Sequence, residues 1–327
     1  MIISRTPLRV SFFGGGSDLP SYYRRHGGAV LSAAIDKSVY VTVSRKFDDA
    51  VRVSYSRTEE VAHASKVEHP LVREALTLLG IEGGVEITSV ADIPASGTGL
   101  GSSSSFTVGL LNALHAFRGK LVSATTLARE SCHIEIDRCG EPIGKQDQYA
   151  AAHGGLNFLR FHPDESVEVR KAVCAPGTLA ALQSHLLFFY TGVTRSASAL
   201  LRNQSSNVAQ PGAKSDGTGA LVNLAETAFD HLCDGKIGDF GALLDEAWQI
   251  KRSLAEGISN AQIDDAYAAA RKAGALGGKV LGAGGGGFLM FFASPESHAA
   301  IRKALAPLRE TPFAFAPEGS SIIFVHE

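Results

Sequence analysis

IPASGTGLGSSSSF, residues 93–106, says more about chemistry than any other part of this sequence. A strand-like apolar run at 85–90 leads into it, and apolar residues at 106, 110, 114 and 117 follow with the spacing of one helix face. Glycines let a backbone approach a ligand closely, and the free amide groups of a helix N-terminus bind anions. The stretch therefore predicts a phosphate-binding loop. The alternative is a plain Gly/Ser turn with a serine N-cap.

The sequence around this loop predicts an α+β protein. Alternating runs before the first long helix predict strands at 8–13, 39–43 and 51–55, and Pro70 opens a short helix with Leu71, Ala75 and Leu78 on one face. After the loop, Ser123 is expected to cap a helix that runs to about Arg138. Further predicted elements are strands at 156–160, 185–190 and 321–325, a mobile loop at 205–219, and helices at 221–232, 240–254, 261–273 and 296–305. A domain boundary is expected near residue 180, giving domains 1–180 and 181–327.

Composition favours an ordinary globular protein without nucleic-acid or membrane partners. The chain has 327 residues, is 45% hydrophobic and 20% charged, and carries a net charge of −2. No apolar run is long enough to span a bilayer, and the first residues lack the pattern of a signal peptide. The four cysteines have no C-x-x-C spacing, so reduced thiols in a cytoplasm are expected. The histidines form no H-E-x-x-H pattern, which argues against zinc.

Other glycine-loop families are excluded by their missing signatures. There is no G-x-x-x-x-G-K-[ST] motif, and the protein-kinase motifs H-R-D and D-F-G are absent. The glycine run at 282–287 leads into a strand-like run at 288–292, whereas a dinucleotide fingerprint leads into a helix.

Three stretches together resemble the motifs of the GHMP kinases. PLRVSFFGGGSDLP (7–20) corresponds to the first motif, PASGTGLGSSSS (94–105) to the phosphate loop, and KVLGAGGGG (279–287) to the third motif, in the family's order. The resemblance implies an N-terminal domain like domain 2 of ribosomal protein S5 and a C-terminal ferredoxin-like domain. ATP and the acceptor are expected to meet in the cleft between them.

Four further stretches resemble the bacterial D-glycero-D-manno-heptose 7-phosphate kinases: FGGGSDLPSYY, GKQDQYAAAHGGLNF, YTGVTRSASALL and EAWQIKRSLA. The resemblance implies an ATP-dependent sugar 1-kinase that forms the 1,7-bisphosphate for nucleotide-activated heptose and surface polysaccharide. Two alternatives stay open: a fucokinase-like kinase of an unphosphorylated sugar, and a non-catalytic regulator that binds sugar and ATP. The oligomeric state is open between a monomer and a homo-oligomer.

The resemblance assigns ATP and Mg²⁺ to the phosphate loop and the helix after it. The residues expected to bind ATP are Pro94, Gly97, Gly99, Leu100, Gly101, Ser102, Ser103 and Ser104. Ser102, with Ser103 as second choice, and Glu135 are the expected Mg²⁺ ligands, since hard oxygen ligands suit this metal. The alternative for Glu135 is a solvated helix carboxylate.

The expected catalytic residues are Asp147, Arg9 and, more weakly, Lys145. A carboxylate near the sugar hydroxyl can accept its proton or orient it, and Arg9 can stabilise phosphoryl charge or hold Asp147 ionised. The alternative for Asp147 is a helix cap.

The residues expected to bind the acceptor are Gly14, Gly15, Gly16, Ser17, Asp18, Arg24, Arg195, Gly284 and Gly285. The alternative for Asp18 is a residue of an Asx turn. Lys251 and Arg252 are two further basic residues, adjacent on one predicted helix; their alternative is a solvated helix face without a role.

One departure from the family bears on the substrate. Galactokinase and its relatives carry Gly-Glu-His in the first motif, whereas this chain has Gly14, Gly15 and Gly16. The acidic side chain that those enzymes point at the sugar is missing, which favours an acceptor that carries a phosphate. Arg195, Arg24 or Arg25 are the expected donors to that phosphate.

Overall fold

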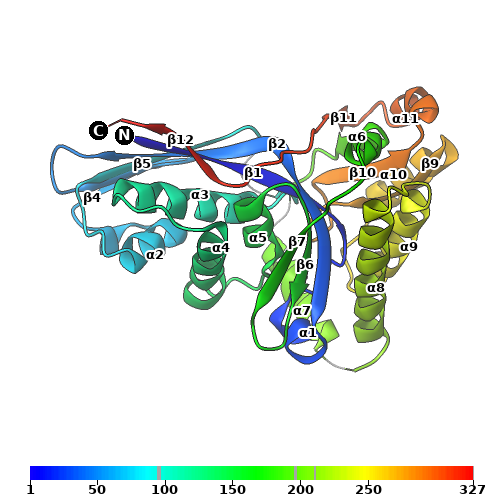
Figure 1. Ribbon diagram of the computed structural model, residues 1–327, viewed down its shortest axis with the longest axis horizontal. Coiled ribbons are helices and arrows are strands. Elements are labelled where there is room, and N and C mark those ends of the chain that lie inside the picture. Colours follow the sequence, from blue (N-terminus) through cyan, green and yellow to red (C-terminus); the bar gives the residue numbers. More distant parts are fainter. Residues whose placement is uncertain (94–96, 195–196, 210, 327) are drawn as a thin grey trace.

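Two β-sheets with helices against them build the molecule (Figure 1). The structure is a computed structural model and describes residues 1–93, 97–194, 197–209 and 211–326, so Pro94 and Arg195 lie outside the described residues. The strands are β1 (Ile2–Phe13), β2 (Gly28–Arg45), β3 (Val51–Ser54), β4 (Thr58–Val61), β5 (Val85–Ala91), β6 (Leu156–Phe161), β7 (Val167–Lys171), β8 (Leu186–Tyr190), β9 (Ala275–Val280), β10 (Phe288–Ala293), β11 (Arg309–Glu310) and β12 (Ser321–Val325).

The helices lie between these strands along the chain. They are α1 (Pro20–His26), α2 (Pro70–Leu78), α3 (Ser102–Phe117), α4 (Ala124–Cys132), α5 (Gln146–His153), α6 (Thr178–Ser184), α7 (Ala197–Val208), α8 (Ala213–Cys233), α9 (Phe240–Ser253), α10 (Ala261–Lys272) and α11 (His298–Ala304). Short 3₁₀ segments occupy Ala64–Lys66 and Pro295–Ser297, and a π-helical segment, His133–Arg138, continues α4.

The larger sheet is organised around the long hairpin of β1 and β2. Its strand order is β12-β1-β2-β5-β3-β4, and β6 pairs with the first half of β2 while β5 pairs with the second half. Helices α3, α4 and α5 lie along one side of this sheet in Figure 1, and the middle of α3 is buried on nearly all sides. The start of α3 and the start of α5 lie beside β1, because Arg9 of β1 bonds through its backbone to Leu100 and through its side chain to Asp147.

The smaller sheet has the order β11-β8-β10-β9 and is antiparallel throughout. Its strand β10 is fully buried, and α9 packs against β9. The chain passes from the larger sheet to the smaller one between β7 and β8, and β12 then returns to pair with β1, so both termini lie at the same end of the molecule (Figure 1).

Most predicted elements are present, and the α+β class is confirmed. The mobile loop predicted at 205–219 is wrong: α7 extends to Val208 and α8 begins at Ala213. The glycines that suggested a loop permit close packing instead, because a Cβ on Gly217 would lie 3.2 Å from Leu254 and one on Gly219 would lie 3.2 Å from the Tyr22 hydroxyl. The helix face predicted from Pro70 is shifted, since Val72 and Leu76 are buried with Ala75.

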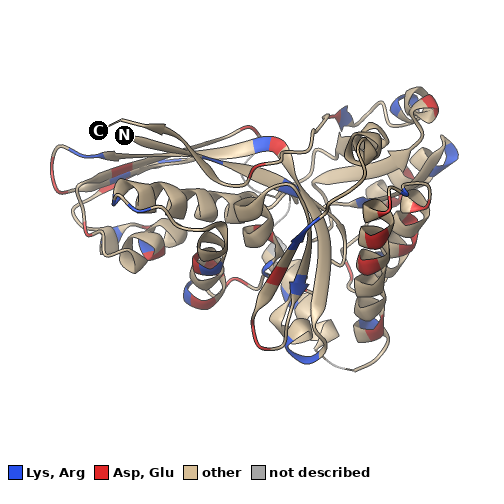
Figure 2. Ribbon diagram, viewed as in Figure 1, with Lys and Arg blue, Asp and Glu red and all other residues tan. Residues whose placement is uncertain are grey.

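Charge is dispersed over the molecule. Figure 2 shows acidic and basic residues interspersed on the outer helices and strand ends. Among the residues that the structure describes, no helix has the length and hydrophobicity that crossing a bilayer requires.

Candidate active site

A cavity of about 520 Å³ collects all three glycine motifs. Gly97, Gly99 and Gly101–Ser104 of the phosphate loop line it, together with Gly15, Gly16 and Asp18 of the first motif and Gly282–Gly284 and Gly286 of the third. Gly101 has a φ of +75° and precedes α3 directly, so the loop turns into the helix N-terminus as the sequence predicts. The start of α3 lines the cavity, and the free amide groups of a helix N-terminus are able to bind an anion.

The third motif packs directly on the phosphate loop. A Cβ on Gly99 would lie 2.3 Å from the carbonyl oxygen of Leu281, and one on Gly282 would lie 2.5 Å from the Cα of Gly99. Both positions therefore require glycine for close approach, apart from any ligand.

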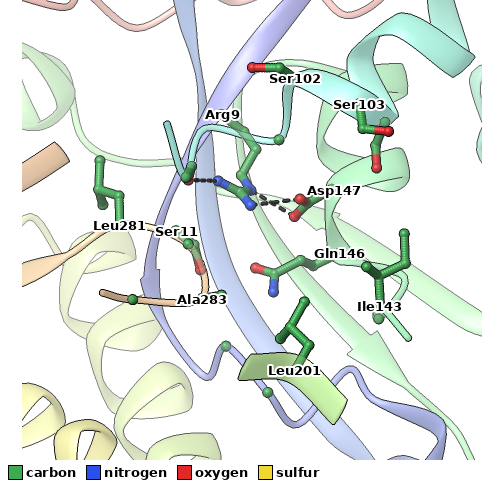
Figure 3. Close-up of a pocket in the computed structure, with 18 of the residues that line it drawn as sticks. Arg9, Ser11, Ser102, Ser103, Ile143, Gln146, Asp147, Leu201, Leu281 and Ala283 are labelled. Atoms are coloured by element: carbon green, nitrogen blue, oxygen red, sulfur yellow. Dashed lines mark hydrogen bonds and ion pairs between the residues drawn. The ribbon is translucent and has the colours of Figure 1, made fainter. Parts of the chain in front are cut away.

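Arg9 and Asp147 form the centre of the cavity (Figure 3). The Arg9 Nε and Nη2 groups each donate to an Asp147 carboxylate oxygen over 2.7 Å, and Nη1 donates to the Gly99 carbonyl oxygen over 2.7 Å. Arg9 is 4% exposed and Asp147 is 23% exposed, so the buried guanidinium fixes a carboxylate that stays accessible from the cavity, next to the phosphate loop. Because both Asp147 oxygens bond to Arg9, the helix-cap alternative for Asp147 does not describe its role.

Asp18 lines the same cavity as Asp147, and three hydrogen-bond donors hold its carboxylate. The Gly16 backbone donates to Asp18 Oδ1 over 2.9 Å, the Gln146 side chain donates to the same oxygen over 3.1 Å, and the Gln146 backbone donates to Oδ2 over 3.3 Å. Burial raises the pKa of Asp18, the Gly16 hydrogen bond opposes this rise, and the nearby Asp147 charge adds to it. Gln146 precedes Asp147 in the chain and bonds to Asp18. Its Oε1 has no hydrogen-bond partner among the described residues.

Glu135 is buried beneath the serines of the loop, so the solvated-carboxylate alternative is wrong. It is 1% exposed, and Ser103 donates to its Oε1 over 2.9 Å while Gln148 donates to its Oε2. Burial raises the pKa of Glu135 to about 7 against the opposing hydrogen bonds. The Ser102 hydroxyl is buried and has no partner within the described part of the chain, which leaves it available to a ligand. One carboxylate and one hydroxyl beside a phosphate site are a suitable donor set for Mg²⁺.

The three glycines of the first motif have different surroundings. A Cβ on Gly14 would lie 1.8 Å from the Ala29 carbonyl oxygen, so Gly14 serves the β1–β2 packing. A Cβ on Gly15 would make ordinary van der Waals contacts, 3.6 Å from Ser11 Oγ and 3.7 Å from Gln146 Nε2, so this glycine is not required by packing. Gly16 has a φ of +106° and lies against the side chains of Gln204 and Lys251.

Several predicted site residues lie away from this cavity. Lys145 and Arg24 line a second cavity of about 680 Å³ and both pair with Glu165, so the structure does not bring them together with Arg9 and Asp147. Ser17 bonds to the Ala29 backbone, and neither Ser17, Leu100 nor Gly285 lines the first cavity. Arg25 donates to backbone carbonyl groups of Ser21 and Val208.

Lys251, named from the sequence as a candidate, is 7% exposed and lines the cavity, so a solvated helix face is the wrong description for it, while Arg252 pairs with Asp264. Other residues in the site were not predicted. Ser11, Thr98, Gln146 and Lys279 also line the cavity. Lys279 begins the third motif and Gln146 adjoins Asp147, so their closeness to the motifs in the sequence could have indicated that they belong to the site. For Lys251, the sequence offered no such signal beyond its charge.

Comparison with known proteins identifies the family of this chain. Residues 58–155 match the family model "GHMP kinases N terminal domain" and residues 225–309 match "GHMP kinases C terminal". The D-glycero-alpha-D-manno-heptose 7-phosphate kinase of Campylobacter jejuni is 28% identical over 97% of each chain. The L-fucokinase/L-fucose-1-P guanylyltransferase of Bacteroides fragilis is 27% identical over 96% of this chain but only 37% of its own length. A solved D-glycero-D-manno-heptose 1-phosphate kinase from Bacteroides thetaiotaomicron superposes with a TM-score of 0.80 over the whole of both chains at 24% identity, which supports the fold alone.

Proposed function

The chain belongs to the GHMP kinases and is a sugar kinase with an alcohol group as acceptor, and we propose that it phosphorylates D-glycero-D-manno-heptose 7-phosphate at the anomeric hydroxyl. The products are the 1,7-bisphosphate and ADP. We place this step in the synthesis of nucleotide-activated heptose for surface polysaccharide, in the cytoplasm.

The observation that carries this proposal is that one cavity contains the phosphate loop, the Arg9–Asp147 pair and Asp18. The phosphate loop adjoins the Arg9–Asp147 pair, because a Cβ on Gly101 would lie 3.2 Å from Asp147 Oδ2 and 3.3 Å from Arg9. Beyond Asp147 lie Gln146 and Asp18, whose unused acceptor sites suit sugar hydroxyl groups. ATP phosphates at the loop and a sugar at Asp18 therefore place the reacting hydroxyl at Asp147.

The transfer needs one bond formed and one broken. The anomeric oxygen forms a bond to the γ-phosphorus, the bond from that phosphorus to the β–γ bridging oxygen breaks, and ADP leaves. The hydroxyl proton is accepted by Asp147 or passes to solvent while Asp147 orients the oxygen. Arg9 holds Asp147 through Nε, and its Nη1 reaches the phosphate loop at the Gly99 carbonyl oxygen, so its charge lies between the two.

Mg²⁺ would be held by Ser102 Oγ and the Glu135 carboxylate, and Ser103 already donates to Glu135. When bound, the metal neutralises charge on the ATP phosphates. These two side chains then set where the phosphates lie relative to Asp147.

The missing side chain at Gly15, which lines the cavity, supports a phosphorylated acceptor. A carboxylate at this position would repel a phosphate, whereas glycine leaves room beside Ser11 and Gln146. The Campylobacter relative, which matches over nearly its full length, is named for the same acceptor.

A fucokinase-like activity is the second candidate, because fucokinase enzymes from Arabidopsis thaliana and Bacteroides fragilis are 26% and 27% identical to this chain. This chain covers only 30% and 37% of those proteins.

ADP release from a panel of hexoses, heptoses and their phosphates separates these candidates. We expect kcat/KM for heptose 7-phosphate to exceed that for the free heptose by at least about a hundredfold, which corresponds to roughly 2.8 kcal/mol. Equal values for the two heptoses, or a preference for L-fucose, would contradict the proposal.

A further inference from the structure

Two buried lysines lie at the acceptor end of the cavity without acidic partners. Lys251 of α9 and Lys279 of β9 are each 7% exposed, and neither forms an ion pair with a carboxylate among the described residues. Lys251 Nζ donates to the Gly15 carbonyl oxygen over 2.9 Å and to Gln204 Oε1 over 3.0 Å. Lys279 Nζ donates to the carbonyl oxygens of Ser11 and Phe12 over 2.9 and 3.1 Å. Each ammonium group thus keeps one N–H for another acceptor.

Buried charges in proteins are normally paired, so this arrangement is costly without a ligand. Burial lowers the pKa of Lys251 to about 8, against the effect of Asp18, and burial together with the charges of Lys251 and Arg9 lowers that of Lys279 to about 7. A bound anion would offset the cost for both lysines.

Neutral donors without partners lie next to these lysines. Ser11 Oγ and Gln204 Nε2 are buried and have no hydrogen-bond partner in the part of the chain that the structure describes. Ser11 adjoins Gly15, and Gln204 lies behind Gly16, where a Cβ would come within 2.1 Å of its Nε2. Figure 3 shows Ser11 pointing into the cavity on the side away from Ser102 and Ser103.

We propose that Lys251, Lys279, Ser11 and Gln204 form the binding site for the phosphate that the acceptor sugar already carries. The inference rests on the proposed function and identifies the donors that it requires. Two ammonium groups and two neutral donors suit a phosphate, whose oxygens accept several charge-assisted hydrogen bonds. Lys251 donates to Gly15 and lies close enough to Asp18 to feel its charge, and Lys279 donates to Ser11, so the site adjoins the first motif, where the proposed function puts the acceptor sugar. Of the three donors expected from the sequence, Arg24 and Arg25 are bound elsewhere, and Arg195 lies outside the described residues.

Lys251→Met tests this site, because it removes the charge and keeps a long side chain. We expect kcat/KM for heptose 7-phosphate to fall at least about a hundredfold more than kcat/KM for the free heptose, with KM for ATP changed by less than about threefold. Lys251→Arg should recover part of the loss. Arg252→Met is the matched control, since Arg252 is the next residue of α9 and pairs with Asp264 outside the cavity.

Binding without turnover gives a second readout. Heptose 7-phosphate alone should raise the melting temperature of the wild type and of Arg252→Met, but not that of Lys251→Met. Lys279→Met should show the kinetic pattern of Lys251→Met; a raised KM for ATP instead would remove Lys279 from this site and place it at the γ-phosphate.

The outcomes separate this inference from the proposed function. If the wild type prefers the phosphorylated heptose and Lys251→Met loses activity equally on both heptoses, or keeps the wild-type preference, the phosphate site is overturned and the function stands. If the wild type itself shows no preference, the function and the phosphate site are both overturned.

Discussion

Asp147 is the residue whose role has the most direct kinetic test. Asp147→Asn keeps the size of the side chain and removes its charge, so proton acceptance is lost while Arg9 keeps a partial partner. General-base assistance contributes about 10²–10⁴-fold in rate, and we expect kcat to fall within that range. Steady-state kinetics should show KM for ATP nearly unchanged.

The control for this variant is Asp164→Asn, at an exposed turn away from the cavity, which should keep wild-type rates. An Asp147→Asn enzyme that retains more than about half of its kcat would exclude Asp147 from the mechanism.

A negative charge introduced at Gly15 tests whether the acceptor carries a phosphate. Its backbone φ lies outside the left-handed region, and the nearest atom to an added Cβ is 3.6 Å away, so a side chain fits. A carboxylate about 4 Å from a phosphate costs on the order of 4 kcal/mol per charge pair at an effective dielectric constant near 20. We therefore expect Gly15→Glu to lower kcat/KM for heptose 7-phosphate by up to about three decades.

Gly15→Gln has nearly the same size without the charge and should lose much less activity. Equal losses in the two variants would mean that crowding, and not repulsion of a phosphate, explains the effect. KM for ATP should stay close to the wild-type value in both.

At the scale of elements, the first turn of α3 combines a ligand site with a structural anchor. Ser102 Oγ has no partner among the described residues, whereas Ser105 Oγ donates to the Pro7 carbonyl oxygen over 2.8 Å. Ser102→Ala should therefore leave the unfolding free energy almost unchanged and raise the Mg²⁺ concentration for half-maximal activity on the order of tenfold. Calorimetry of Mg²⁺-dependent ADP binding checks this without turnover.

Ser105→Ala should show the opposite pattern. It removes a buried hydrogen bond and should cost about 1 kcal/mol of stability, with the Mg²⁺ dependence kept. A Ser102→Ala protein with unchanged Mg²⁺ dependence would exclude Ser102 as a metal ligand.

The elements also show what the sequence could and could not predict. The phosphate loop, α3 and β12 were predictable because local spacing and glycine placement determine them. The helix α8 was predicted to start too late, since Gly217 and Gly219 are unfavourable in an isolated helix and only tertiary packing explains them. The first half of β2 was missed because both faces of this strand are buried, which removes the alternation that marks a strand.

Some residues of the candidate site could be predicted from the sequence, and others could not. Arg9, Asp18 and Asp147 could be predicted because they lie inside motifs, and the structure brings them together. Lys251 belongs to a helix from the other half of the chain, and only tertiary folding shows that it is buried next to Gly16. Lys145 lies two residues before Asp147 yet points into another cavity, because α5 begins between them.

For the whole molecule, the buried lysines predict how stability depends on pH. The folded-state pKa of Lys251, about 8, lies below its ordinary value of 10.5, so between these values the unfolded chain binds more protons. Stability therefore rises with pH across this window and is lost as the pH falls through the folded pKa. A shift of this size corresponds to about 3 kcal/mol.

Urea unfolding of the ligand-free protein between pH 7 and 10 measures this effect. The wild type should gain stability relative to Lys251→Met as the pH rises, by up to about 3 kcal/mol. Parallel curves for the two proteins would show that Lys251 is not desolvated in solution.

The central claim is that a phosphate is transferred to the anomeric oxygen of a sugar that already carries one. The most direct measurement is ³¹P NMR of the product formed from heptose 7-phosphate, ATP and Mg²⁺. We predict a new phosphorus signal coupled to the anomeric proton, equal in amount to the ADP formed, with the 7-phosphate signal retained. A new signal coupled to any other sugar proton, or no sugar-dependent formation of ADP, would contradict the account.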